Sequence, residues 1–440
     1  MTSQELEKIL YFHNPWWREK KVPQELLPPF KRPILEQLKK YLKTLNRIII
    51  IKGPRRTGKT TLLYQLIQSI LDEKKEPLEI LFLSFDDLKL RQDLEKTLGI
   101  YEKIRGKTLK EPQIYCFLDE VHFLDNWSLI VKKYFDKKYP IKFIISSSSA
   151  SLFKKSLESL AGRTVEELIL PFNFKEFACY FLREDKNFLE FLEKKKFTPY
   201  ASELKILFEK YLNRGGFPHL LEVDEPSLWE KLLREDVLEK VIYRDLVGLY
   251  GIREPEKLEK TFLYLSNITA QILNFSNLAK NLGISRQHLE KYIFYLKEAY
   301  LVFLIPLWSH SPAKSIRKPS KIHLIDPGLA NVFGLRVNQD LIIESIVARH
   351  LFDLKGKLFY FRNHYEIDFI LENKKEIKPI EVKNKEKPEV NDFKNLFLFM
   401  KKYKLKEGLL LCRDYEGKKR SENFTIKIMP LWKWLMEYDL

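Results

Sequence analysis

This sequence contains few cysteines, and it lacks long apolar runs and an apolar leader. Its 440 residues include only 3 cysteines, Cys116, Cys179 and Cys412, in no pairing pattern, so we expect a reducing compartment and no zinc site. No apolar run approaches the ~20 residues that a membrane-spanning helix needs, and the first residues lack the apolar core of an export signal. We therefore predict a cytoplasmic protein with no membrane partner.

Acidic residues are in the minority. The sequence has 60 acidic and 77 basic residues, a formal net charge of +17 and a pI near 9.3. This balance makes nucleic acid the first partner to consider, although a basic surface can also aid solubility or bind membranes. The apolar content of 45% indicates a globular chain, and the length predicts about two to four domains.

Residues 53–60, with the sequence GPRRTGKT, fit the phosphate-binding pattern G-x-x-x-x-G-K-S/T. A mainly apolar run at 47–51 precedes them and a helix-period pattern at 61–67 follows, which is the strand, loop and helix that phosphate binding needs. Lys59 is expected to reach the β- and γ-phosphates of ATP, and Thr60 to offer its hydroxyl to Mg²⁺. The expected nucleotide contacts are Gly53, Pro54, Arg55, Arg56, Thr57, Gly58, Lys59, Thr60 and Thr61.

Two further apolar runs, 79–85 and 114–118, predict strands of the same sheet, and the second runs into Asp119 and Glu120. At this distance after the phosphate loop, the pair indicates that Asp119 binds Mg²⁺ through water and that Glu120 polarises the attacking water. The alternative is an acidic pair on the surface.

A fourth predicted strand, 142–145, runs into four serines. Ser146 is placed to sense a γ-phosphate at the end of a strand; alternatively, Ser148 or Ser149 caps the helix that follows. Beyond that helix, Arg163 either reaches a phosphate in its own or a neighbouring subunit or forms a surface ion pair.

Residues 171–245 show helical patterns with a turn at 213–218, and two short amphipathic helices separated by Gly283 lie within 256–308. This is helix-turn-helix spacing, and the apolar run 300–305 with the basic loop 314–318 predicts a wing. Such folds also serve protein contacts. The expected DNA contacts are Arg286, Gln287, Lys291, Lys314, Arg317 and Lys318.

From residue 321 onwards the pattern is α/β: a helix at 340–353, strands at 358–361, 366–371 and 377–383, a helix near 391–403 and a strand at 408–412. Asp368 on one strand and Glu381 and Lys383 on the next form a metal-nuclease pattern, in which alternation places Val382 in the core. Asp368 and Glu381 would bind Mg²⁺, Lys383 would orient or activate water, and Glu344 would complete the site. Such folds also persist as inert binding domains.

As a set, these stretches resemble the prokaryotic AAA-type ATPases that carry a C-terminal domain of unknown function with a PD-(D/E)xK-like core. Further matching segments are NPWW at 14–17, AGR at 161–163, GGFP at 215–218, YRD at 243–245 and IDPGL at 325–329. The resemblance implies ATP binding and hydrolysis, a winged helix and a nuclease-like end. The chain departs from the family at 146–148, where a glycine is missing, and at His323, where an aromatic residue is common.

The predicted fold class is a multidomain α/β protein. Its predicted parts are an N-terminal extension (1–30), a P-loop AAA-like ATPase domain whose parallel sheet has helices on both faces (31–170), a helical subdomain (171–255), a winged-helix domain (256–320) and a PD-(D/E)xK nuclease-like domain (321–440). Trp16 and Trp17 are expected to pack onto the ATPase domain, the alternative being base stacking.

Three functions fit these patterns. The leading hypothesis is a Mg²⁺-dependent ATPase that couples ATP binding and hydrolysis to DNA binding and DNA processing, with duplex or branched DNA as the partner. A homo-oligomer follows if Arg163 acts in trans. The alternatives are an ATP-gated nuclease of a defence or repair system, and a nucleotide-controlled switch that binds a protein partner and has no nuclease activity.

Overall fold

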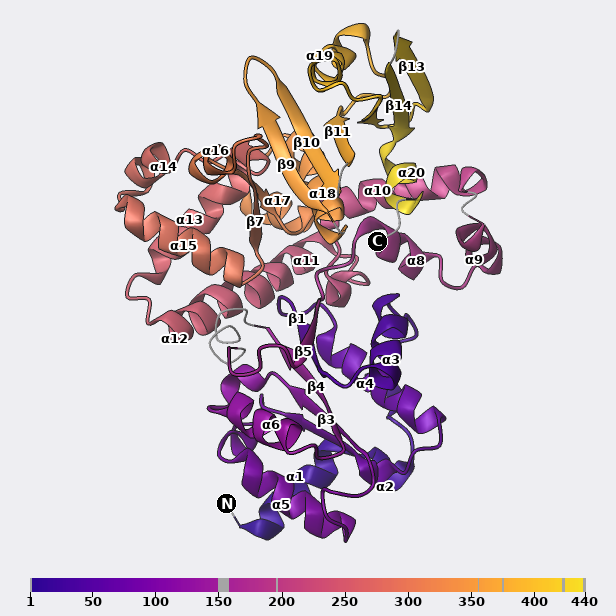
Figure 1. Ribbon diagram of the computed structural model, residues 1–440, viewed down its shortest axis with the longest axis vertical. Coiled ribbons are helices and arrows are strands. Elements are labelled where there is room, and N and C mark those ends of the chain that lie inside the picture. The colour runs from indigo at the N-terminus through magenta and orange to yellow at the C-terminus, as the bar shows by residue number, and fades with distance from the viewer. Residues whose placement is uncertain are drawn as a thin grey trace. The chain divides into compact units, whose positions relative to one another are not determined.

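The computed structural model describes residues 2–148, 158–194, 197–354, 356–373, 376–421 and 424–437, apart from the side chains of Val237, Pro312, Lys314 and Ile316. The chain forms two compact units, residues 1–170 and 171–440 (Figure 1). Within the described ranges, no helix has both the length and the apolar character that crossing a membrane requires.

The first unit is built on a sheet of five parallel strands in the order β2-β3-β4-β1-β5. The strands are β1 (Ile48–Lys52), β2 (Ile80–Ser84), β3 (Ile114–Asp119), β4 (Ile141–Ser147) and β5 (Thr164–Leu168). The apolar runs correctly predict the first four, which are almost completely buried. β5 was not predicted, because this edge strand is polar in sequence and only half-buried.

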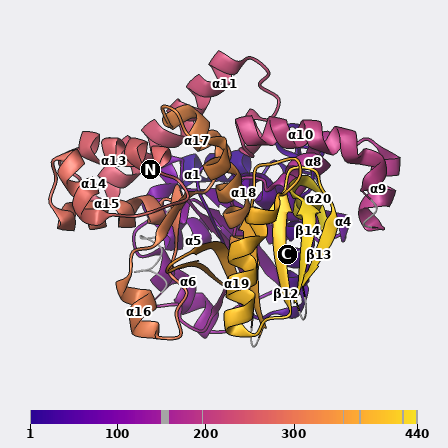
Figure 2. The ribbon, with the colours of Figure 1, turned by 90° about the horizontal axis from the view of Figure 1, so that it is seen from above.

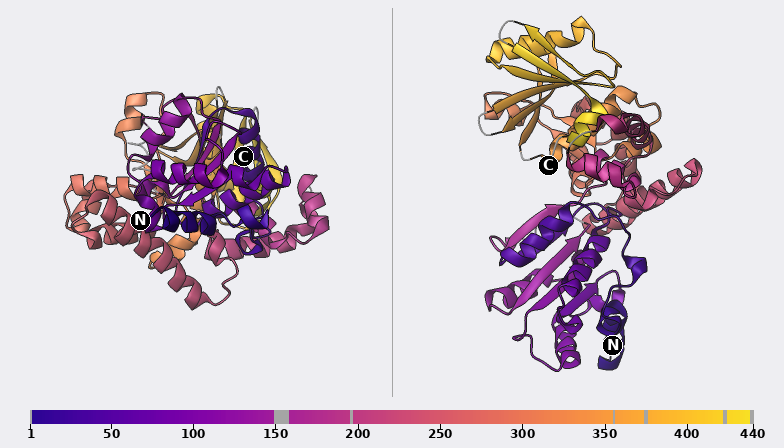
Figure 3. Two further views of the ribbon diagram at one scale, coloured as in Figure 1. Left: turned by 90° about the horizontal axis from the view of Figure 1, so that it is seen from below. Right: turned by 90° about the vertical axis from the view of Figure 1, so that its right-hand side faces the viewer.

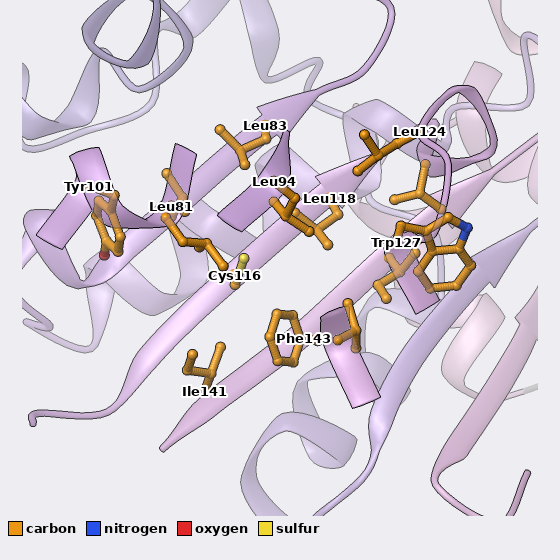
Figure 4. Packing of buried hydrophobic residues seen from close by; sticks show 14 of the residues in the cluster. Leu81, Leu83, Leu94, Tyr101, Cys116, Leu118, Leu124, Trp127, Ile141 and Phe143 are labelled. Carbon is orange, nitrogen blue, oxygen red and sulfur yellow. The ribbon is translucent and has the colours of Figure 1, made fainter. Parts of the chain in front are cut away.

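Helices cover both faces of this sheet, as predicted. The helices α3 (Ile34–Thr44) and α4 (Lys59–Asp72) pack on one face, and α1 (Ser3–His13), α5 (Leu94–Arg105) and α6 (Trp127–Asp136) pack on the other. Because side chains alternate along a strand, Cys116 and Leu118 of β3 face α5 and α6 together with Leu81 and Phe143 (Figure 4). Their neighbour Phe117 faces α4.

The N-terminal residues cover the outer edge of β2. The Asn14 side-chain amide donates to the carbonyl oxygen of Phe82 (3.0 Å) and accepts from its N–H (2.6 Å). The indole N–H groups of Trp16 and Trp17 both donate to the carbonyl oxygen of Ile80. These groups take the place of a further strand, since an edge strand otherwise leaves its outer polar groups unpaired. Trp16 is completely buried in a cluster with Leu63 and Phe82, which confirms the prediction that it packs onto the ATPase domain.

The second unit begins with the helices that were predicted for residues 171–245. They are α8 (Phe174–Phe181), α9 (Lys186–Glu193), α10 (Ala201–Arg214), α11 (Pro226–Leu233), the π-helical segment Arg234–Leu246 and α12 (Val247–Tyr250).

A small helical segment with a three-stranded antiparallel sheet, in the order β6-β8-β7, follows. Its elements are α13 (Pro255–Asn267), β6 (Gln271–Ile272), α14 (Phe275–Leu282), α15 (Arg286–Glu298), β7 (Val302–Ile305), α16 (Pro312–Arg317) and β8 (Lys321–Leu324). The prediction of a basic loop at 314–318 is wrong, because residues 312–317 form the short helix α16. A proline at the first helical position suits the start of a helix, since its backbone angle is preset.

The last part of the unit contains a mixed sheet in the order β13-β14-β12-β11-β10-β9. Its elements are α17 (Pro327–Phe333), α18 (Gln339–Asp353), β9 (Lys357–Arg362), β10 (Glu366–Asn373), β11 (Glu376–Val382), α19 (Lys394–Tyr403), β12 (Glu407–Cys412), β13 (Gly417–Ser421), β14 (Phe424–Pro430) and α20 (Leu431–Glu437). Figure 2 shows α19 beside β12 and β14, against which it packs, and the right-hand view of Figure 3 shows the strands from orange to yellow as one twisted sheet.

Two sequence landmarks without assigned chemistry meet inside the second unit. The Asp326 carboxylate accepts hydrogen bonds from the N–H groups of Gly216 (2.7 Å) and Gly328 (2.9 Å). Gly215 has a φ of 72°, and a Cβ there would lie 1.9 Å from Asp326 Oδ1. The GGFP and IDPGL segments are therefore two sides of one buried contact, which explains their glycines and their aspartate structurally.

We predict that Gly215→Ala destabilises the second unit by about 3 kcal/mol, because the methyl group adds overpacking to left-handed backbone strain. Gly283→Ala is the matched control: its φ is 63°, but a Cβ there would meet nothing within 4 Å, so about 1 kcal/mol is expected. Hydrogen exchange of peptides covering 205–220 and 325–335 measures both effects. Equal destabilisation by the two variants would contradict the proposed contact.

Burial raises the pKa of Asp326 to about 7, although the N–H donors of Gly216 and Gly328 and the charge of Arg349 each lower it. A carboxyl group whose pKa is higher in the folded than in the unfolded chain binds more protons when folded. Its contribution to stability is therefore complete at low pH and is lost as the pH rises towards 7. We expect Asp326→Asn to be less stable overall but to lack this pH dependence. Urea unfolding followed by tryptophan fluorescence across this pH range measures the slope, and an unchanged slope in the variant would rule the assignment out.

Candidate functional site

The loop between β1 and α4 begins where the backbone passes close to the segment after β5. The N–H of Ile169 donates to the carbonyl oxygen of Lys52 (2.7 Å), and a Cβ at Gly53 would lie 1.9 Å from the carbonyl oxygen of Ile169. Only glycine fits there. Gly58 has a φ of 85° and precedes α4 directly. The loop therefore ends with its N–H groups at the start of a 14-residue helix, an arrangement that binds anions.

Lys59 is buried inside this loop. Its ammonium donates to the carbonyl oxygens of Gly53 (3.1 Å) and Pro54 (2.8 Å) and lies 3.8 Å from Glu120 Oε1. The side chain of Thr57 closes the loop from within by donating to the carbonyl oxygen of Pro54 (3.0 Å). The structure thus places a buried cation between the loop and the acidic pair, and its reach to the phosphates of ATP stays a prediction.

Asp119 joins three neighbouring elements. It accepts hydrogen bonds from the hydroxyl of Thr60 on α4 (3.0 Å) and from the hydroxyl of Ser146 on β4. These side chains meet because β1, β4 and β3 are adjacent and parallel, so their carboxyl ends share one edge of the sheet. Burial, together with the charge of Glu120, raises the pKa of Asp119 to about 6 against these two hydroxyls. The two predicted Mg²⁺ ligands, Thr60 and Asp119, are in direct contact.

Glu120 lies beside Lys59 with its backbone in the left-handed region, at a φ of 52°. Its carboxylate accepts the N–H of Ser148 (2.9 Å) and lies 3.2 Å from His122 Nδ1. Burial works against ionisation, but the charges of Lys59, His122 and Arg55 outweigh it and lower the pKa of Glu120. Glu120 is thus held as a carboxylate. The sequence analysis misses His122, although its place two residues after the acidic pair could have revealed it.

Ser146 is completely buried, and its hydroxyl also accepts the N–H of Glu120 (3.1 Å). It therefore contacts both acidic residues, and its γ-phosphate sensor role stays a prediction. The alternative, a helix cap by Ser148 or Ser149, involves residues 149–153, which lie outside the described residues.

Arg163 lies where the parallel strands begin, whereas the phosphate loop lies where they end. Its carbonyl oxygen pairs with Ile48, the first residue of β1, whereas the loop follows the last residue of that five-residue strand, about 16 Å away. Its guanidinium pairs with Asp136 (2.6 Å). The prediction that Arg163 reaches a phosphate in its own subunit is therefore wrong, and the surface ion pair is present. Action in a neighbouring subunit stays a prediction.

The predicted DNA contacts in the second unit are dispersed. Arg286, Gln287 and Lys291 are exposed on α15, and Arg286 pairs with Glu290 (2.9 Å). Arg317 and Lys318 are exposed at and after the end of α16, and the side chain of Lys314 is outside the described part. DNA binding by these residues stays a prediction.

The four residues of the predicted nuclease site do come together. Lys383 donates to Glu381 (2.7 Å), the N–H of Val382 donates to Asp368 (2.8 Å), and Glu344 on α18 reaches the same cluster. Burial and the charge of Asp368 raise the pKa values of Glu344 and Glu381 to about 8. The prediction that Val382 lies in the core is wrong: Val382 is half-buried, whereas Glu381 is buried.

Two members of this cluster escape the sequence analysis. Lys321 on β8 pairs with Glu344 (2.8 Å), Glu366 (2.6 Å) and Asp368 (3.9 Å). Glu366 could have been found, because it lies two residues before Asp368 on the same strand and shares its face. Lys321 gives no such signal, since it lies in a different sheet and among apolar residues.

Comparisons with known proteins divide the chain into three segments. Residues 45–178 match a family described as an AAA domain, residues 205–340 match "Domain of unknown function (DUF8612)", and residues 340–434 match "Domain of unknown function (DUF4143)". A solved structure of AMPPCP-bound DnaA from Aquifex aeolicus is 17% identical, covers 65% of this chain and 93% of that one, and has a TM-score of 0.31, which is too low to support an inference.

Two relatives come from Methanocaldococcus jannaschii. The uncharacterized protein MJ1637 is 29% identical over 76% of this chain and 73% of that protein. The uncharacterized protein MJ1544 is 31% identical over 89% of each chain. The first unit is thus an AAA-type P-loop domain, and the chain belongs to the family of MJ1544.

Proposed function

We propose that the protein is a Mg²⁺-dependent ATPase whose first unit binds and hydrolyses ATP, and that the second unit couples this cycle to DNA. The observation that carries the first part is the convergence of Lys59, Thr60, Asp119, Glu120 and Ser146 at one edge of the sheet.

The loop and Lys59 are placed to hold the triphosphate of the substrate. The N–H groups of residues 53–60 would bind phosphate oxygens, and the Lys59 ammonium would exchange its two carbonyl acceptors for the β- and γ-phosphates. The hydroxyl of Thr60 and the carboxylate of Asp119 would hold Mg²⁺, because hard oxygen donors suit this ion and these two already touch. When bound, Mg²⁺ would neutralise charge that builds up on the phosphates.

Glu120 is proposed as the general base. Its carboxylate would accept a proton from water while the water oxygen bonds to the γ-phosphorus and the bond to the ADP oxygen breaks, giving ADP and phosphate. The lowered pKa of Glu120 keeps its side chain in the carboxylate form. Ser146 would hold Asp119 and the backbone of Glu120 in place through its two hydrogen bonds.

For the second unit we propose a winged helix and a PD-(D/E)xK-like core. The order helix, strand, two helices, strand, short helix and strand in residues 255–324 supports the winged helix. The order α18, β9, β10, β11, α19, β12 supports the core. The net charge of +17 and the exposed Arg286 and Lys291 of α15 support DNA as the partner. A homo-oligomer with Arg163 acting in trans belongs to the same proposal.

A second candidate is a nucleotide-controlled switch that binds a protein partner without nuclease activity. The specific observation that favours it over the ATP-gated nuclease is Lys321, whose ammonium lies among the carboxylates of the nuclease-like cluster.

We predict that Lys59→Ala abolishes ATP hydrolysis and that Glu120→Gln lowers turnover by about 100-fold or more while ATP stays bound, since the base acts on the chemical step. Phosphate release and nucleotide retention on the protein measure the two effects. Lys133→Ala, which removes an exposed lysine of the same unit, is the matched control and keeps parental turnover. Parental turnover in both site variants would refute the proposal.

For DNA, we expect the double variant Arg286→Ala/Lys291→Ala to bind duplex DNA more weakly and with a shallower salt dependence. Each phosphate that the variant no longer neutralises should lower the log–log slope by about 1. Lys297→Ala removes a charge at the other end of α15 and is the matched control. Fluorescence anisotropy at several salt concentrations measures the slopes. Equal slopes for all three chains would favour the protein-binding switch.

A further inference from the structure

Lys59 and Lys321 are buried lysines in two different surroundings. Lys59 donates to uncharged main-chain carbonyls of the phosphate loop. Lys321 is 2% exposed and its ammonium faces carboxylates on two other elements, α18 and β10. Isolated buried charges are costly unless they are paired, so Lys321 and these carboxylates stabilise one another.

The ammonium of Lys321 lies where a metal ion would have to bind. It is 2.8 Å from Glu344 and 3.9 Å from Asp368, two of the four predicted nuclease residues, and 2.6 Å from Glu366. A Mg²⁺ ion needs oxygen ligands at about 2.0–2.1 Å in an octahedral arrangement. A dication drawing on these same oxygens would be in contact with the ammonium and repelled by it.

The remaining donors of the cluster are engaged as well. Glu381 is paired with Lys383 at 2.7 Å, and the second oxygen of Asp368 accepts the N–H of Val382 at 2.8 Å. Across the part of the chain that the structure describes, no group of three or more His, Cys, Asp or Glu side chains is arranged to hold a metal ion. The donor set of the nuclease-like core therefore does not fit the ion that its fold implies.

We propose that Lys321 is a built-in cation that takes the place of a divalent metal ion in the second unit, so that the nuclease-like core serves as a metal-free binding domain. No cleavage step is assigned to it. The proposal does not depend on ATP hydrolysis, because every residue that carries it lies in the second unit and its test measures metal binding.

The lysine also connects parts of the unit that are distant in the sequence. Lys321 belongs to the three-stranded sheet β6-β8-β7, whereas its partners Glu344 and Glu366 lie on α18 and on the six-stranded sheet. A metal ion would join only the elements of the core. The lysine instead joins the core to the segment that carries α14 and α15.

The first test uses Mn²⁺ and electron paramagnetic resonance on the full chain. Asp119→Asn removes the metal candidate of the first unit, so the remaining signal reports the second. We expect Asp119→Asn and Asp119→Asn/Asp368→Asn to give the same weak Mn²⁺ titration. If Asp119→Asn holds a Mn²⁺ ion that Asp368→Asn removes, the proposal is overturned.

The second test removes the lysine. Asp119→Asn/Lys321→Ala is expected to gain a Mn²⁺ site at least about tenfold tighter than any in Asp119→Asn, and a further Asp368→Asn should abolish it. Lys357→Ala removes an exposed lysine of β9 in the matched control and gains no site. A folded Lys321→Ala chain, judged by circular dichroism, that gains no Mn²⁺ site would also overturn the proposal. Loss of the buried cation could prevent folding, in which case the first test decides.

Discussion

The hydrogen bonds that Asp119 accepts from Thr60 and Ser146 are the contact on which the first unit depends for its chemistry. They bring together a helix start, a strand end and a neighbouring strand, and they exist because the strand order places β4 between β1 and β3. In another strand order the same residues would be separated. Lys59 directly precedes Thr60 and Glu120 directly follows Asp119, so the same contact also positions these two side chains.

The two units use a buried lysine in opposite ways. The ammonium of Lys59 lies 3.8 Å from Glu120 but donates its hydrogen bonds to neutral carbonyls, which a triphosphate can replace, because charged acceptors bind an ammonium more strongly. Lys321 already has carboxylates as partners, so an incoming anion has little to offer it. The same residue type is therefore available to a ligand in one unit and committed to the fold in the other.

The residues that meet at the candidate site of the first unit could be named from the sequence, because they lie in short segments with fixed spacing at the ends of apolar strands. Their contacts with ATP stay predictions. His122 was missed, although it follows the acidic pair by two residues, and β5 was missed because its polar residues hide an edge strand. Of the alternatives for Arg163, the sequence could not exclude a phosphate in its own subunit, because position along the chain does not say at which end of a strand a residue lies; the surface ion pair is the alternative that the structure contains.

In the second unit, alternation along β10 and β11 correctly brought Asp368, Glu381 and Lys383 together. Strand alternation could not predict that Lys321 joins this cluster, because Lys321 lies in another sheet and only three-dimensional packing brings it there. Residues 413–437 were also missed: β13, with the sequence GKKRS, is almost entirely exposed and has no apolar alternation.

The cover that Asn14, Trp16 and Trp17 place over β2 has a consequence for how copies of the protein meet. Sheets from two molecules merge when bare strand borders align, and amyloid grows in this way. Here the amide of Asn14 and the indole groups of Trp16 and Trp17 form hydrogen bonds with main-chain groups on the outer side of β2. Proteolytic removal of the first 17 residues would expose the main-chain groups of Ile80 and Phe82 and turn this border into a site where a second molecule could pair.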